Sequence, residues 1–149
     1  GILHCDIGPR NIILSSMGLP VLIDFGSARL ALAQQGHDPT ILVTPHYSPQ
    51  EVYNSSGAQR GPWTDIYAAA AVLHTLLLGA PPPNAPERAL GAGKVTLSAL
   101  PRLQIYRHGF LSAVDWALEF MPSRRPQTVQ SWAATLLPPS NGSTGGLRL

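Results

Sequence analysis

The sequence has 149 residues, of which 44% are hydrophobic and 12% charged. This length fits one domain, and the hydrophobic share is too high for a disordered chain. The formal net charge is only +2, so we expect neither nucleic acid nor a membrane surface as a partner. Cys5 is the single cysteine, which excludes an internal disulfide. Because the chain also lacks a basic and apolar leader, we expect a cytoplasmic protein.

The N-terminal part predicts a small β-hairpin. Residues 1–14 begin as a loop and end in a short, partly β-branched run at 11–14. Turn-forming residues follow at 15–18, and a second short apolar run spans 20–24. Two such runs joined by a turn are typical of a hairpin. The next stretch, 27–51, is polar and mixed and predicts no regular element.

The longest apolar run spans residues 66–80 and predicts a buried helix. Thr64 and Asp65 precede it, and Gly79 with three prolines ends it. The run is shorter than the roughly 20 residues of a membrane span, so no membrane insertion is expected. A short helix that is apolar on every side belongs inside the protein.

Two later helices are predicted, at 110–120 and 128–137, the second capped by Thr128. Trp116 and Trp132 are expected to anchor them in the core. Residues 84–109 are hard to interpret, and only 95–103 indicates order. The Gly-, Ser- and Asn-rich end is expected to be disordered. The predicted fold class is mostly α, with one small hairpin at the N-terminal edge.

Two aspartates stand in two motifs that indicate phosphoryl-transfer chemistry. Asp6 lies in the segment His-Cys-Asp-Ile-Gly-Pro-Arg-Asn at 4–11, and Asp24 opens Asp-Phe-Gly. An aspartate followed five positions later by Asn11, then by a hairpin and Asp-Phe-Gly, is the layout of such a site. Taken singly, Asp6 could be a capping residue and Asn11 and Asp24 ordinary turn residues.

From Leu3 to Leu137 the chain resembles the C-terminal lobe of a eukaryotic-type Ser/Thr protein kinase, of the kind also found in bacteria. Five segments match the family's motifs in order and spacing. Residues 4–11 resemble its H-R-D with the later Asn, 24–26 its D-F-G, and 44–51 its G-T-P-x-Y-x-A-P-E. Residues 64–67 resemble its S-D-I-Y, and 124–126 its R-P. The resemblance implies a kinase-like C-lobe over 1–138, a helical bundle around a central buried helix with the hairpin at its ATP-facing edge. Residues 139–149 would be a disordered tail.

The resemblance also implies roles for single residues. Asp6 would take the proton of the acceptor hydroxyl, and Thr44 would position that acceptor on a protein substrate. Asn11 and Asp24 would hold Mg²⁺ on ATP, and Ile13 would lie beneath the adenine. The supporting residues would be His4, Phe25 and Gly26, Asp65 as an acceptor for backbone N–H groups of the catalytic loop, and Glu51 and Arg125 as an ion pair.

Three positions depart from the family pattern. Cys5 replaces an arginine that receives a phosphate from the activation loop, so activity is not expected to depend on that switch. Gly8 replaces a lysine that faces the transferring phosphoryl group. Arg10, four residues after Asp6, would supply the missing cation, as in some tyrosine kinases, although arginine and lysine differ at phosphate sites.

The motifs leave three function classes open. The favoured one is a protein kinase domain that appears here as a fragment, because the Gly-rich loop, strand lysine and helix glutamate of the N-terminal lobe would all lie upstream. The isolated chain is then expected to be inactive. The second class is a pseudokinase or remnant that binds a partner protein, as Cys5 and Gly8 suggest. The third is a small-molecule phosphotransferase, against which residues 44–51 argue.

Overall fold

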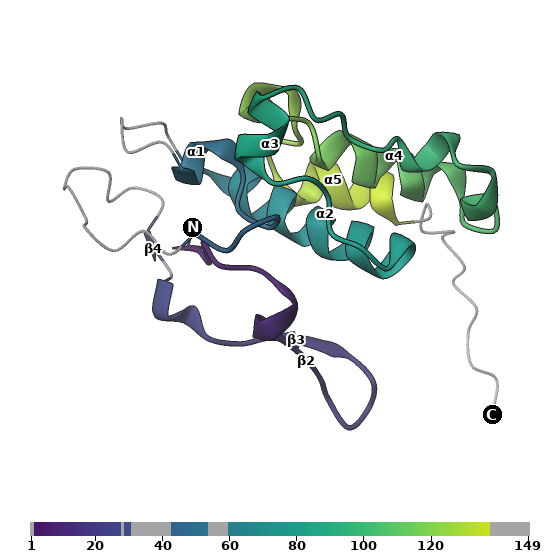
Figure 1. The fold of residues 1–149 in the computed structure, drawn as a ribbon. Coiled ribbons are helices and arrows are strands. Elements are labelled where there is room, and N and C mark those ends of the chain that lie inside the picture. Colours follow the sequence, from purple (N-terminus) through teal and green to yellow (C-terminus); the bar gives the residue numbers. More distant parts are fainter. Residues whose placement is uncertain (1, 28, 31–42, 54–59, 138–149) are drawn as a thin grey trace, which may run out of the picture.

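The computed structural model describes residues 2–27, 29–30, 43–53 and 60–137. Its strands are β1 (Ile2–Leu3), β2 (Ile12–Leu14), β3 (Pro20–Leu22) and β4 (Arg29–Leu30), and its α-helices are α1 (Gln50–Tyr53), α2 (Pro62–Leu78), α3 (Ala85–Ala89), α4 (His108–Ala117) and α5 (Val129–Leu136). The helices form one body, and the loop of β2 and β3 projects from it (Figure 1). Helices dominate, as predicted. No helix in the described segments is long and apolar enough to cross a bilayer.

Helix α2 is the predicted central helix, and it begins earlier than the apolar run. Pro62 occupies its first turn, where a missing N–H costs nothing. The backbone N–H of Gly61 donates to the Thr64 hydroxyl at 3.3 Å. Gly79 ends the helix with φ 74°, a left-handed conformation that glycine adopts freely. Burial on most sides of the helix explains why the sequence shows no polar stripe.

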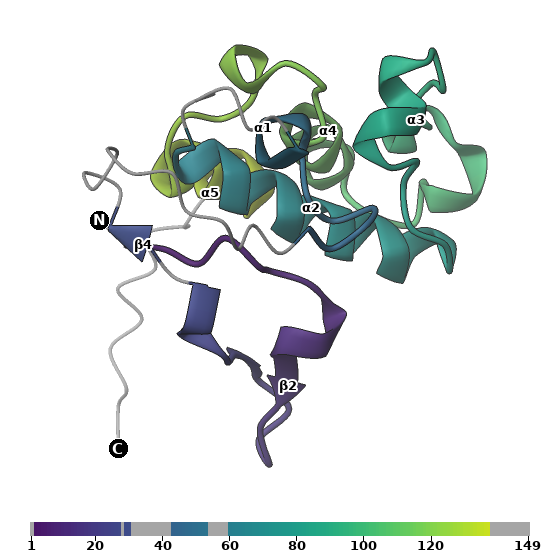
Figure 2. The same cartoon turned by 60° about the vertical axis from the view of Figure 1, so that its left-hand side comes forward.

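Helices α4 and α5 pack against α2 to form the core (Figure 2). Trp132 of α5 is 7% exposed, and its indole N–H donates to the Ala113 carbonyl at 2.9 Å. Trp116 of α4 is instead 37% exposed. The prediction that it lies in the core was wrong, because its indole N–H reaches the exposed Arg124 carbonyl at 2.8 Å. The predicted cap is present: the Thr128 hydroxyl accepts from the Ser131 amide.

The predicted hairpin is confirmed, and a second strand pair was not foreseen. In the hairpin Ile12 faces Leu22 and Ile13 faces Val21 in an antiparallel register. In the other pair Ile2 faces Leu30. Large apolar side chains remain exposed on the hairpin and its turn: Ile13, Leu14, Met17, Leu19 and Val21.

The structure adds short helices to segments that the sequence left undefined. Helix α3 starts at a reciprocal cap, in which Asn84 accepts from the Glu87 amide at 2.9 Å and Glu87 accepts from the Asn84 amide at 2.8 Å. Two 3₁₀ turns, Leu97–Ala99 and Pro101–Leu103, occupy the stretch expected to be ordered. The predicted tail at 139–149 lies outside the described residues.

Candidate active site

The carboxylate of Asp6 is the centre of a hydrogen-bonded cluster. Asp6 is 8% exposed and lies in the loop between β1 and β2. Its Oδ1 accepts from the Thr44 hydroxyl at 2.7 Å and from Arg10 Nη2 at 3.1 Å. Its Oδ2 accepts from Arg10 Nη2 at 2.8 Å and from Asn11 Nδ2 at 2.9 Å. The cluster thus joins residues four, five and 38 positions away along the chain.

These donors keep Asp6 ionised. Burial by itself would raise the pKa of Asp6, since it removes water from the charged form. The hydrogen bonds from Thr44, Arg10 and Asn11, with the positive charge of Arg10, outweigh burial and lower the pKa below its ordinary value. At neutral pH the group is therefore a carboxylate, which accepts hydrogen bonds and can receive a proton.

Asn11 connects the Asp6 loop to Asp24. Its side-chain N–H₂ group also donates to the Asp6 carbonyl at 2.7 Å, which fixes the loop around it. The backbone carbonyl of Asn11 accepts from the Ile23 amide at 2.9 Å. The Ile23 carbonyl in turn contacts His4 Nε2 at 3.1 Å. Ile23 is therefore held at both its backbone groups, and this holds the chain in place immediately before Asp24.

Asp24 has a strained local backbone. Its φ is 61°, which is uncommon outside glycine. Oδ1 accepts from the Gly26 amide at 3.1 Å, and a Cβ atom at position 26 would lie 3.0 Å from that oxygen. A side chain at position 26 would therefore push the Asp24 carboxylate away from this position. Phe25 between them is 58% exposed, and its ring centroid lies 4.8 Å from that of His4.

Asp65, in the first turn of α2, anchors the loop that carries Asp6. Oδ2 accepts from the His4 amide at 2.7 Å, and Oδ1 accepts from the Cys5 amide at 2.9 Å. Burial raises the pKa of Asp65, and the two amide bonds only partly offset this rise. The backbone at Cys5 is left-handed, with φ 63°, so these bonds hold the chain in a turn that side chains disfavour.

The segment that contains Thr44 is fixed independently of Asp6. The Thr44 amide donates to the Ser48 hydroxyl at 2.9 Å, and the Thr44 carbonyl accepts from the Ser48 amide at 2.9 Å. Tyr47 contacts the Thr75 hydroxyl of α2 at 3.2 Å. His46 Nδ1 contacts the Pro82 carbonyl at 2.9 Å. The segment is thus held against α2 and the residues that follow it.

Glu51 and Arg125 form a buried ion pair behind this segment. Both residues are 2% exposed. Arg125 Nη1 and Nη2 donate to the two carboxylate oxygens of Glu51 at 2.8 and 3.2 Å. The Thr64 hydroxyl donates to the same carboxylate at 3.0 Å. The pair therefore ties α1 to α2 and to the turn that precedes α5.

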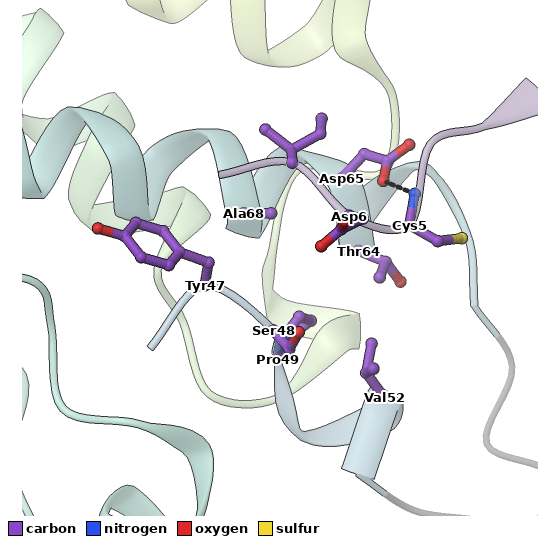
Figure 3. A pocket seen from close by; sticks show the side chains of 10 residues that line it. Cys5, Asp6, Tyr47, Ser48, Pro49, Val52, Thr64, Asp65 and Ala68 are labelled. Atoms are coloured by element: carbon purple, nitrogen blue, oxygen red, sulfur yellow. Dashed lines mark hydrogen bonds between the residues drawn. The ribbon is translucent and has the colours of Figure 1, made fainter. Parts of the chain in front are cut away.

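A small pocket opens between the Asp6 loop, helix α2 and residues 47–52 (Figure 3). Asp6 and Cys5 line it from one side and Asp65 from α2, and the dashed line in Figure 3 marks the bond from the Cys5 amide to Asp65. Its lining includes neither Asn11 nor Asp24. The pocket is therefore a gap beneath the Asp6 loop, separate from the residues assigned to nucleotide and metal.

The chemistry of Asn11 and Asp24 fits Mg²⁺. The Asn11 nitrogen is committed to Asp6, which leaves its amide oxygen as the group available to a metal. Asp24 adds a carboxylate, and oxygen donors are the ligands that Mg²⁺ prefers. In the part of the chain that the structure describes, no three His, Cys, Asp or Glu side chains gather around a metal position. A metal here would depend on these two residues together with nucleotide oxygens and water.

Gly8 and Ile13 complete the set of singled-out positions. Gly8 is buried, and a Cβ atom there would lie 3.8 Å from Tyr47 and 3.9 Å from Thr44, an ordinary contact distance. Ile13 is 48% exposed on the hairpin. Sequence reasoning missed the bond between Arg10 and Thr44, at 3.2 Å, because no local pattern shows that residues 34 positions apart will meet.

The chain is similar in sequence and in fold to known proteins. A solved structure described as the apo form of PpkA-294 matches with a TM-score of 0.73 and 41% identity, covering 91% of this chain and 46% of that one. The chain is 32% identical over 133 residues to serine/threonine-protein kinase PknK of Mycobacterium bovis, and 30% identical over 132 residues to PknH of the same species. These alignments cover 86% and 85% of this chain but only 12% and 21% of those proteins.

The chain is also 37% identical over 86 residues to the DNA damage-responsive serine/threonine-protein kinase RqkA of Deinococcus radiodurans, an alignment that covers only 55% of this chain and 12% of that protein. The family match is broader, because residues 1–135 match the protein kinase domain. Together with the cluster around Asp6, this match shows that the chain belongs to the protein kinase domain family.

Proposed function

We propose that this chain belongs to an enzyme that transfers the γ-phosphate of ATP to Ser or Thr hydroxyls of a protein. The chain would supply the residues that bind and deprotonate the acceptor hydroxyl. One observation carries the proposal. An ionised, buried Asp6 contacts Thr44, Arg10 and Asn11 at once, so a proton acceptor, an acceptor-positioning group, a cation and an oxygen ligand for metal meet at one point. The relatives named above are all serine/threonine-protein kinases, which supports Ser and Thr hydroxyls as the acceptors.

In this proposal Asp6 orients the acceptor hydroxyl and receives its proton, because its carboxylate is held rigidly at the loop tip. Thr44 places the substrate backbone beside Asp6. Arg10 supplies the positive charge that Gly8 does not, since its guanidinium is 55% exposed yet reaches the carboxylate. Asp65 positions the loop without touching the substrate.

Asn11 and Asp24 would hold Mg²⁺ on the nucleotide, and Ile13 would contact the adenine. When bound, Mg·ATP supplies the phosphoryl group and neutralises its charge. The chain's own contribution is to hold Asn11 against Asp6 and, through the bond of the Ile23 amide to Asn11, the backbone immediately before Asp24. We include in the proposal that residues 1–138 act as a C-terminal lobe and that nucleotide-clamping groups come from elsewhere in the native protein, so that this chain by itself transfers little phosphate.

The test is phosphate transfer from labelled Mg·ATP to myelin basic protein by the native full-length protein, beside its Asp6→Asn variant. We expect transfer that falls by at least about 100-fold in the variant, the usual scale for a general base. The shape of asparagine is close to that of aspartate, so a circular dichroism melt should show that the variant still folds. Transfer that survives in Asp6→Asn would refute the proposal.

A second candidate, a protein-interaction module without transfer activity, is favoured by two observations. Gly8 leaves the site without its usual lysine, and the exposed side chains of the hairpin, Leu14 and Met17 among them, offer an apolar surface. Absence of transfer by a folded native protein that also fails to bind Mg·ATP would favour this candidate.

A further inference from the structure

The carboxylate of Asp6 is already engaged by three donor side chains on both its oxygens. A carboxylate offers about four lone-pair positions. Oδ1 accepts from Thr44 and Arg10, and Oδ2 accepts from Arg10 and Asn11, all within 2.7–3.1 Å. An acceptor hydroxyl has to come within hydrogen-bond reach of the same oxygens. An acceptor hydroxyl that binds there therefore competes with these three donors for the two enclosed oxygens.

The three donors differ in how freely they can leave. Asn11 is 5% exposed and is also bonded to the Asp6 carbonyl at 2.7 Å, so its departure would open the loop. Thr44 sits on a backbone that is tied to Ser48 through both its amide and its carbonyl. Arg10 has a long side chain that is 55% exposed, so water can replace its contacts at little cost.

A single nitrogen atom makes all of the Arg10 contacts. Nη2 bonds both oxygens of Asp6 at 2.8 and 3.1 Å and the Thr44 hydroxyl at 3.2 Å. One rotation of the guanidinium group therefore removes two hydrogen bonds from Asp6 and one from Thr44 together. The groups that are uncovered are those assigned to the acceptor hydroxyl and to its positioning.

We propose that Arg10 is a removable mask on the acceptor site: its Nη2 covers Asp6 and Thr44 at rest and withdraws when the acceptor hydroxyl binds. This inference rests on the proposed function. It gives Arg10 two opposed effects, because the mask competes with the acceptor whereas the cation assists transfer. Removal of the side chain should therefore lower KM for the acceptor and lower kcat as well, a pattern expected when a ground-state contact is lost together with a catalytic one.

The kinetic test uses the native protein with saturating Mg·ATP and myelin basic protein as the varied acceptor. In Arg10→Ala we expect acceptor KM to fall about two- to fivefold, the range for an exposed ion pair, and kcat to fall. The matched control is Arg102→Ala, which removes an exposed arginine outside the site and should change neither constant. An acceptor KM that stays equal or rises in Arg10→Ala would overturn the mask.

The double variant Gly8→Lys/Arg10→Ala separates the two effects. A Cβ atom at position 8 makes only ordinary contacts, so a lysine can be introduced there to return a cation to the site. We expect kcat to recover in part while acceptor KM stays low. Recovery of kcat together with a return to the wild-type KM would overturn the proposal, because the KM would then follow the cation and not the mask.

A second readout needs no activity. Native protein labelled with ¹³C at aspartate carboxyl groups is titrated without nucleotide or acceptor, and the Asp6 signal is assigned from Asp6→Asn. Loss of the mask should raise the pKa of Asp6 in Arg10→Ala and leave it unchanged in Arg102→Ala. An unchanged pKa in Arg10→Ala would overturn the mask even if transfer occurs. If the pKa is raised in Arg10→Ala but the wild-type protein transfers no phosphate, the resting contact stands, and both the exchange with an acceptor and the proposed function are rejected.

Discussion

At the scale of single residues, Arg125 makes more contacts than any catalytic candidate. Besides Glu51, its side chain donates to the carbonyls of Glu119 at 2.7 Å and Phe120 at 2.8 Å, and its guanidinium lies 4.7 Å from the ring centroid of Tyr67. We expect Arg125→Met to lower the free energy of unfolding by about 3–5 kcal/mol, because it leaves the Glu51 charge buried without its partner. Urea unfolding of the native protein measures this loss.

Two further variants make that measurement specific. Arg102→Met removes an exposed arginine and should change the unfolding free energy by no more than about 0.5 kcal/mol. The double variant Glu51→Leu/Arg125→Met should cost less than the sum of its single changes, because no lone charge remains buried. A loss of less than about 1 kcal/mol in Arg125→Met would show that the pair does not hold α1 in place.

At the scale of elements, the first turn of α2 positions the loop of the active site. Each Asp65 oxygen accepts one backbone amide, from His4 and from Cys5, and hydrogen bonds to charged groups contribute about 1.5–3 kcal/mol each. We expect Asp65→Ala to speed hydrogen exchange at these two amides by tenfold or more, while the amides of α2 itself stay protected. Exchange of the native protein, followed residue by residue, tests this.

Glu87→Ala is the matched control for Asp65→Ala. It also removes a carboxylate that accepts a backbone amide at a helix start, but in α3, where Glu87 bonds Asn84. Exchange at His4 and Cys5 should be unchanged in this variant. If both variants speed exchange at the loop equally, the effect comes from general destabilisation and not from the Asp65 bonds.

The sequence predicted elements with strong patterns and failed where pairing is long-range or the element is short. Helix α2 was predictable because its residues are apolar over several turns, and the hairpin because a turn separates two apolar runs. Strand β1 has two residues and pairs with β4 far along the chain, so neither shows any period. Helix α3 has five residues, yet the Asn84 and Glu87 spacing of its cap was a readable signal.

The candidate site divides in the same way. Asp6, Asn11 and Asp24 could be singled out from the sequence because each stands in a compact motif with fixed spacing, and their roles stay predictions. The hydrogen bonds that Arg10 and Thr44 make together to Asp6 could not be predicted, since they depend on where these two side chains meet in space. Trp116 shows the opposite failure: its position on α4 suggested burial, but the need of its indole N–H for an acceptor was met at the surface.

At the scale of the whole molecule, buried polar groups hold the irregular segment after α2 to the helical body. Asp115 of α4 is 7% exposed and accepts from the amides of Leu97 and Ser98 at 2.8 and 2.9 Å. His74 of α2 is 3% exposed, and its Nδ1 contacts the Ala80 carbonyl at 3.0 Å. These contacts tie the segment to the helical body through buried polar side chains, and His74 among them can change its charge.

His74 should make that stability depend on pH. Its Nε2 is buried and meets no hydrogen-bond partner among the described residues. Burial lowers the pKa of His74, and the Ala80 carbonyl and the nearby charge of Asp115 only partly oppose this. The unfolded chain, with an ordinary pKa near 6.5, therefore binds a proton at pH values where the folded chain does not, and stability should fall as pH drops below about 6.5.

The measurement is the unfolding free energy of the native protein at several pH values between 8 and 5, in wild type and in His74→Asn. Asparagine keeps a donor for the Ala80 carbonyl but cannot titrate. We expect the wild type to lose up to about 1.4 kcal/mol per pH unit more than the variant below pH 6.5, the limit for one proton. His108→Asn, at an exposed histidine, should keep the wild-type slope. Parallel curves for wild type and His74→Asn would mean that the buried ring is not the group that titrates, and that the contact with Ala80 survives acid.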